Sequence, residues 1–225
     1  MTKVFEKSII GKIKLNNKII RSATHEGMAD KEGFPTDKLK NLYIKLAKGG
    51  VGAIITGYTG VLANGKASLV GMTMIDDNKY IPKFQEVTEA VHEHNTPIIL
   101  QLAHCGRQTR SVSTGYPIVA PSAIRDKLYN DTIPLELTDS GINEIIDAFV
   151  SSIVRAKKSN FDGVQLHLAH GYLLAQFLSS YTNRRKDKWS DERIPKLDNT
   201  KVEYEFIREE IVKTEENVIR AVSNI

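Results

Sequence analysis

The sequence predicts an α/β fold in which parallel strands alternate with helices. Short apolar runs with the composition of buried parallel strands, each followed by a polar or glycine-containing turn, cover residues 51–56, 97–102 and 162–168, with a weaker candidate at 18–23. Segments of helical period lie between them, at residues 37–48, 81–94 and 138–159. This strict alternation is typical of right-handed βαβ units on a parallel sheet.

Each predicted helix has a start signal. Thr36 stands directly before the first helix, Pro82 lies in the first turn of the second, and Thr138 precedes the third. Threonine at these positions can accept a hydrogen bond from a free backbone N–H group of the first turn. We therefore expect the helices to begin at these residues.

Loop lengths favour a barrel over an open doubly wound sheet. An open dinucleotide-binding sheet would need a G-x-G-x-x-G turn after a strand, and residues 57–65, GYTGVLANG, do not supply it. The loops after the second and third strands are long, at about residues 58–80 and 104–138. Barrel enzymes place their chemistry on loops at that carboxyl-terminal face.

We expect the chain to form the N-terminal half of a (β/α)8 TIM barrel, as a single domain of residues 1–225. A complete barrel has eight strands and typically about 250 residues. About four parallel strands are predicted here, followed by a helix at residues 201–222. A barrel truncated in this way exposes two sheet edges, so a homo-oligomer or a completing chain is expected to cover them.

Composition and charge argue against several classes of protein. The net charge of +4 is spread along the chain without a long basic block, which disfavours nucleic acid binding. No segment reaches the roughly 18 apolar residues of a membrane helix, and the N-terminus lacks a signal-peptide pattern. The single cysteine, Cys105, excludes an internal disulfide and a cysteine-based metal cluster, and we expect it to be a packed small residue. A soluble cytoplasmic protein is expected.

Polar residues interrupt the apolar pattern near the ends of the third and fourth strands. With a two-residue period, Gln101, Gln165 and His167 lie on the face opposite to the apolar sets, so they point into the barrel. A buried amide or imidazole without a partner costs about 1–3 kcal/mol. These side chains therefore bind a ligand, or they bond to one another or to ordered water.

The segment 166–172, LHLAHGY, concentrates the candidate chemistry. His167 and His170 could donate hydrogen bonds to one oxygen if the turn swings the second imidazole inward, and Tyr172 could act beside them as a proton source. Two histidines at this spacing could instead bind zinc, although no third ligand is evident, so no metal site is assigned. They could also be two polar loop residues.

Four segments together resemble the ordered motifs of the Old Yellow Enzyme family of FMN oxidoreductases. They are residues 21–28 (RSATHEGM), 101–107 (QLAHCGR), 120–124 (APSAI) and 170–184 (HGYLLAQFLSSYTNR), and the resemblance extends from about residue 5 to residue 187. Several independent motifs in family order are far more specific than any one alone.

The resemblance implies roles for residues already singled out. Gln101 would bond the pyrimidine edge of FMN, and His167 with His170 would hold the carbonyl or nitro oxygen of an activated alkene. Tyr172 would protonate the α-carbon. The resemblance also implies that NADH or NADPH is the reductant and that Ala23, Thr24 and Tyr58 lie against the isoalloxazine.

The chain also departs from the family pattern. Ala23 stands where many relatives have proline, and His25 stands where cysteine or threonine often occurs. After Asp187 the usual glycine pair and Asn-Arg are replaced, and the later arginine and phosphate site of the family lie outside these 225 residues. The main hypothesis is an FMN-dependent ene-reductase. The alternative is a truncated, non-catalytic half-barrel that acts only by association with another chain.

Overall fold

A computed structural model describes residues 3–128 and 132–190 of the chain. Its central parallel sheet contains β3 (Ile20–Arg21), β4 (Ala53–Ile55), β7 (Ile98–Ala103) and β10 (Gly163–Leu166). These strands lie side by side in chain order, and every pair is parallel. β3, β4 and β10 lie within predicted segments, and β7 extends one residue past the predicted end at 102. The prediction of a parallel half-barrel is confirmed.

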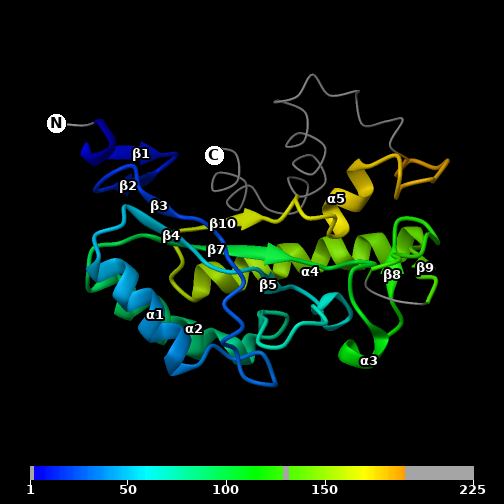
Figure 1. Ribbon diagram of the computed structural model, residues 1–225, viewed down its shortest axis with the longest axis horizontal. Helices are drawn as coiled ribbons and strands as arrows, with labels where there is room; N and C mark the ends of the chain where they lie inside the picture. Colours follow the sequence, from blue (N-terminus) through cyan, green and yellow to red (C-terminus); the bar gives the residue numbers. More distant parts are fainter. Residues whose placement is uncertain (1–2, 129–131, 191–225) are drawn as a thin grey trace.

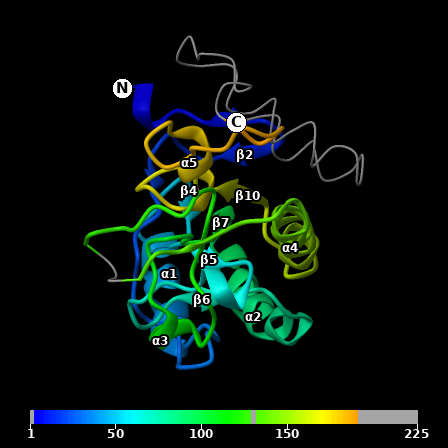
Figure 2. The same ribbon diagram turned by 90° about the vertical axis from the view of Figure 1, so that its right-hand side faces the viewer.

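Three helices connect these strands and pack on one side of the sheet (Figures 1 and 2). They are α1 (Asp37–Lys48), α2 (Ile81–His92) and α4 (Asp139–Lys158). The side chain of Thr36 accepts a hydrogen bond from Leu39 N, and that of Thr138 accepts one from Gly141 N. The predicted start signals are confirmed, while α2 ends two residues before the predicted position 94.

The core lies between the sheet and these helices. Ile98, Leu100 and Leu102 are fully buried on the helix side of β7. Val164 of β10 and Phe149 of α4 belong to the same cluster. The apolar face predicted from the two-residue period is therefore the face that packs on the helices, and the other face is left for the site.

Smaller elements occupy the connections. They are η1 (Lys3–Phe5), β1 (Ser8–Ile10), β2 (Ile13–Leu15), β5 (Thr59–Gly60), η2 (Ala63–Gly65), β6 (Thr73–Met74), η3 (Asn78–Tyr80), α3 (Ser111–Thr114), β8 (Val119–Ala120), β9 (Leu135–Glu136) and α5 (Leu173–Leu178). The β1–β2 hairpin was not predicted from the sequence. It is antiparallel, and the Ile13 side chain approaches β10 at Gly163.

The long loops predicted at the carboxyl-terminal face contain short strands of their own. β5 pairs with the end of β7, where Thr59 lies opposite Leu102, and also with β6. In the loop after β7, β8 pairs with β9 in parallel. These pairings give the loops a fixed position beside the strand ends.

The helix predicted at residues 201–222 lies outside the described residues, and a single domain over residues 1–225 stays a prediction. Within the described ranges, none of the helices combines the length and apolar character that a membrane crossing requires.

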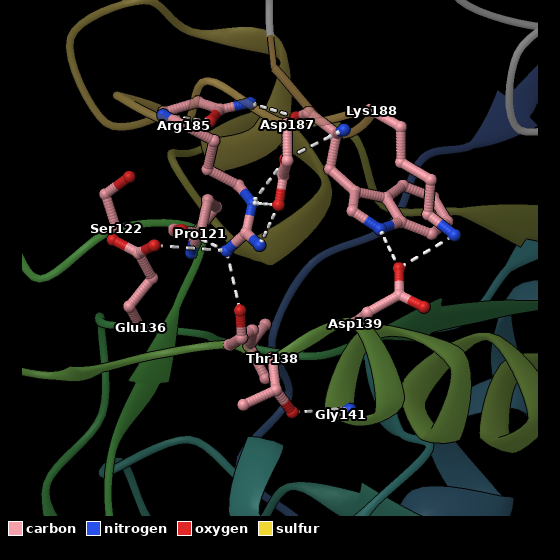
Figure 3. A network of polar contacts seen from close by, with 12 residues as sticks. Pro121, Ser122, Glu136, Thr138, Asp139, Gly141, Arg185, Asp187 and Lys188 are labelled. Carbon is pink, nitrogen blue, oxygen red and sulfur yellow. Dashed lines mark hydrogen bonds and ion pairs between the residues drawn. The ribbon is translucent and has the colours of Figure 1, made fainter.

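A polar network fixes the chain after α5 (Figure 3). Arg185 Nη1 donates hydrogen bonds to the carbonyls of Pro121 (3.0 Å) and Leu137 (2.6 Å), and the guanidinium pairs with Asp187. Trp189 is buried, and its Nε1–H donates to Asp139 at the start of α4 (2.6 Å). The segment that follows β10 is thus anchored on the loop that follows β7.

The position of Leu100 at the centre of the core gives a stability prediction. Leu100→Ala should lower the free energy of unfolding by about 2–5 kcal/mol, because it removes buried methyl groups and leaves a cavity. Leu128, which is 87% exposed, offers a matched control, and Leu128→Ala should change the free energy by less than about 0.5 kcal/mol. Urea denaturation followed by circular dichroism measures both, and equal effects would contradict the assigned core.

Candidate active site

Aromatic rings from two loops meet at the carboxyl-terminal ends of the strands. The ring of His167 lies 4.8 Å from that of Tyr172, and Tyr58, which follows β4, lies 5.5 Å from Tyr172 and 6.0 Å from His167. His170 is 5.0 Å from His167 and 6.4 Å from Tyr172 between ring centroids. The structure brings these four residues together; the grouping of His167, His170 and Tyr172 was expected from their spacing, and Tyr58 was expected near them from the family resemblance.

Gln101 and Gln165 form an amide pair beside these rings. The two residues are in direct register across β7 and β10, and Gln101 Nε2 donates to Gln165 Oε1 at 2.7 Å. The sequence left open whether the inward polar residues bind a ligand or bond to one another, and these two glutamines bond to one another. A primary amide offers two donors and one acceptor oxygen with two lone pairs. The pair therefore retains the Gln101 oxygen as an acceptor and the Gln165 amino group as a donor for a ligand.

His167 is a neutral hydrogen-bond donor. Its Nδ1 accepts from the backbone N–H of Ala169 (3.2 Å), which places the ring proton on Nε2, and Nε2 lies 3.1 Å from His170 Nδ1. The pKa of His167 is lowered to about 4, first by burial and then by the neighbouring His170. In this structure the two histidines bond to each other, so His170 carries its own proton on Nε2.

A left-handed turn brings the second histidine inward. His170 has φ 56° and Gly171 has φ 69°, and two successive residues in this region reverse the chain directly after the strand. A residue other than glycine in this region costs about 1–3 kcal/mol and persists only where the surroundings hold it. The sequence argument needed this turn but could not establish it.

Tyr172 packs on a small apolar cluster that includes Tyr58, Met72, Ala103 and Cys105. Cys105 is fully buried, and burial raises the pKa of its thiol to about 12, although a hydrogen bond from Tyr172 opposes this shift. A thiol in this state is not a nucleophile near neutral pH. The prediction that Cys105 is a packed small residue is confirmed.

The segment after β3 contributes His25 to the site. Its ring stacks on Tyr58 with centroids 4.9 Å apart and planes inclined by 19°. Ala23 is half-buried, Thr24 is exposed, and both lie in the same segment after the end of β3. His25 was noted in the sequence only as a departure from the family pattern, and the stacking of its ring on Tyr58 could not be inferred from its position.

A buried ion pair behind the site was missed by sequence reasoning. Arg21 Nη2 lies 2.8 Å from Glu26 Oε1, and the same oxygen accepts from the Tyr43 hydroxyl (2.9 Å) and from Gly57 N (3.2 Å). A Cβ at Gly57 would come within 2.1 Å of the Glu26 carboxylate. The network joins the ends of β3 and β4 to α1 and thereby positions the residues next to Gly57, including Tyr58.

A second buried histidine fixes the loop after β7. His104 Nδ1 accepts from Gly106 N (3.1 Å), and its Nε2 therefore donates to Asn64 Oδ1 (2.9 Å). Burial lowers its pKa to about 3, so the ring is neutral.

As for the zinc alternative at His167 and His170, no group of three metal-ligating side chains is found within residues 3–128 and 132–190.

Comparison with known proteins finds one matching family model, described as the NADH:flavin oxidoreductase / NADH oxidase family, over residues 3–193. A metal reductase of Desulforamulus reducens is 40% identical over 189 residues, which are 84% of this chain and 28% of that protein. An NADPH dehydrogenase of Listeria monocytogenes is 36% identical over 190 residues, 84% of this chain and 55% of that protein. The chain thus spans little more than half, or less, of these relatives.

Solved structures agree with the fold. The Old Yellow Enzyme homologue of Zymomonas mobilis matches with a TM-score of 0.79 and 26% identity, over 94% of this chain and 60% of that one. Morphinone reductase matches with a TM-score of 0.81 and 24% identity, over 96% of this chain and 59% of that one. At this identity the second similarity is evidence for the fold alone.

The lowered pKa values predict how the site responds to pH. His167, with a pKa of about 4, and His104, with a pKa of about 3, should stay neutral from pH 8 to pH 5. Histidine in the unfolded chain titrates near 6.5. Below pH 6.5 the unfolded chain therefore binds more protons than the folded chain, and the free energy of unfolding should decrease as the pH falls. Nitrogen NMR of labelled histidine follows the rings directly. A midpoint near 6.5 for His167 would contradict its buried, neutral state.

Proposed function

The chain belongs to the NADH:flavin oxidoreductase / NADH oxidase family, and on this basis we propose that it supplies the substrate-binding half of an FMN-dependent NAD(P)H oxidoreductase that reduces activated alkenes. The observation that carries this proposal is the convergence of Tyr58, His167, His170 and Tyr172 beside the Gln101–Gln165 amide pair. Enones, enals and nitroalkenes are the proposed substrates, with NADH or NADPH as reductant.

The amide pair fits the proposed cofactor. The pyrimidine edge of a flavin presents an N–H group between two carbonyls. The Gln101 oxygen and the Gln165 amino group supply the complementary acceptor and donor. Ala23, Thr24 and Tyr58 follow β3 and β4, on either side of the Glu26 network, and are the proposed contacts to the isoalloxazine.

Bound FMN would supply hydride transfer from the nicotinamide to the β-carbon of the alkene. The two histidines would bind the oxygen that activates this alkene. His167 donates from Nε2–H, and the substrate oxygen takes the place now occupied by His170 Nδ1. His170 donates to the same oxygen through its own Nε2–H. Neutral donors aimed at an oxygen on which charge develops lower the barrier.

Tyr172 is the proposed source of the second hydrogen. Its ring is next to His167 and Tyr58, and a phenol remains protonated near pH 7. The proton would pass from the hydroxyl to the α-carbon, on the substrate held by the histidine pair. Proton transfer by a positioned side chain typically contributes a rate factor of about 10²–10⁴.

Further chains are part of the proposal. Among the described strands, β3 pairs only with β4 and β10 pairs only with β7 within the sheet. An unpaired parallel edge readily adds another strand. We propose that another copy or a completing chain covers these edges, that nucleic acid and membranes are not partners, and that the protein is cytoplasmic.

Cofactor binding tests the proposal directly. After incubation with FMN and removal of unbound flavin by gel filtration, the purified chain should be yellow and should bleach with NADH under anaerobic conditions. Gln101→Leu should weaken FMN binding roughly three- to tenfold, since it removes one neutral hydrogen bond. Gln85 of α2 donates to Lys158 O at the end of α4, at an exposed site on the helix layer, and Gln85→Leu should leave binding unchanged. A colourless chain that only self-associates would favour the non-catalytic half-barrel.

The role of Tyr172 predicts an effect on one half-reaction only. Tyr172→Phe should slow alkene reduction by about a hundredfold or more, because it removes the proton source. Flavin reduction by NAD(P)H should stay within about twofold, since no proton from Tyr172 is needed there. Stopped-flow absorbance separates the two steps, and equal losses in both would contradict the assignment.

A further inference from the structure

The side chain of Gln176 connects the two loops that carry the site. It lies in α5 and is 1% exposed. Its Nε2 donates to the carbonyls of Gly171 (2.7 Å) and Cys105 (3.1 Å), and its Oε1 accepts from the N–H of Arg107 (3.2 Å). One buried amide therefore uses both donors and its acceptor on backbone groups of the loops after β7 and β10.

The space around this amide is closely fitted. A Cβ at Gly106 would come within 2.3 Å of Gln176 Oε1. Glycine at this position has φ 57°, so the loop passes the amide in a conformation that side chains rarely adopt. The loop after β7 is thus shaped to receive the Gln176 side chain, and a longer or charged group would not fit the same bonds.

Gln176 also holds the strained turn that carries the catalytic histidine. The Gly171 carbonyl directly follows the left-handed His170, and Gln176 Nε2 binds that carbonyl. The next residue, Tyr172, is the N-cap that directly precedes α5, and its carbonyl accepts from Gln176 N (2.8 Å). Leu173 N donates to His104 O (2.9 Å). Both ends of the dipeptide Gly171–Tyr172 are therefore fixed by the same element.

We propose that Gln176 is a positioning residue, whose amide holds the Gly171 carbonyl so that His170 contacts His167 and Tyr172 lies beside Tyr58. A left-handed His170 costs about 1–3 kcal/mol, comparable with what buried hydrogen bonds of this kind contribute. Without the two donors of Gln176 the turn relaxes and the rings separate. The catalytic consequence rests on the function proposed above, whereas the structural consequence does not.

Two variants of the full chain distinguish the contribution of the two Nε2–H donors of Gln176 from that of its Oε1 acceptor. Gln176→Glu keeps an acceptor for Arg107 N–H but loses both donors when ionised, and Gln176→Met loses all three bonds. Gln85→Met is the matched control, because Gln85 also donates to a backbone carbonyl, Lys158 O, at 2.9 Å but at an exposed site on α2.

The structural readout uses nitrogen NMR of labelled histidine and needs no cofactor. The wild type and Gln85→Met should show His167 in the Nε2–H tautomer, bonded to His170. In both Gln176 variants this bonded tautomer should be lost, with the rings exchanging between tautomers. Folded Gln176 variants that keep the wild-type histidine signals would overturn the proposal.

The kinetic readout distinguishes this proposal from the proposed function. In the FMN-loaded protein, kcat for alkene reduction should fall about tenfold or more in both variants, as a small misplacement of reacting groups can cost about a hundredfold. Flavin reduction should stay within about twofold. Absence of turnover in the wild type would sink the proposed function and leave the NMR test intact.

A wild-type measurement covers the case in which the variants do not fold. The two side-chain amide protons of Gln176 should exchange with solvent at least about tenfold more slowly than those of Gln85. Both protons of Gln176 are hydrogen-bonded in a buried position, whereas Gln85 lies at an exposed site. Equal exchange rates would show that the amide does not hold the turn, and would overturn the proposal.

Discussion

The pairing register of β7 and β10 is the constraint on which the site depends. Gln101 lies opposite Gln165, and Leu102 lies opposite Leu166. A slip of one residue would turn the leucines toward the site and the amides into the core, because side chains alternate between the two faces. Burial of Leu100 and Leu102 against the helices opposes such a slip. The same packing that stabilises the half-barrel therefore presents the amide pair at the strand ends.

Local signals predicted the sheet and the helices, and contacts between distant residues had to be observed. The bounds of α1 agree with the prediction because Thr36 and the apolar period are adjacent in sequence. Glu26 and Tyr43 of the ion-pair network are 17 positions apart in the sequence, and the two glutamines of the amide pair are 64 positions apart. Spacing indicated which face Gln101 occupies but not which partner it takes. Likewise, the left-handed His170 depends on its surroundings, because positive φ is uncommon for residues other than glycine and residue type alone does not predict it.

Two buried histidines at the site are neutral, and a charge pair lies behind it. Burial keeps His104 and His167 uncharged. Glu26 is buried, yet Arg21 and the Tyr43 hydroxyl bind its carboxylate on the side of α1. Hydrogen bonds from buried donors such as His167 to a charge that develops on a bound molecule are stronger than in water, because the effective dielectric constant is lower. This arrangement suits the proposed reaction, in which negative charge develops on the substrate oxygen and a proton is then added at the α-carbon.

Hydrogen bonds hold the segment from β10 to Trp189 at two places, Gln176 and Arg185. Gln176 ties it to the backbone at Cys105 and Arg107, and Arg185 ties it to Pro121 and Leu137. Each tie is a hydrogen bond to a backbone carbonyl or N–H, so it fixes the path of the loop after β7 as well. Reactive side chains on loops are precise only when a second set of contacts holds those loops. The fold meets this requirement by bonding the two loops to each other, so neither can move without displacing the other.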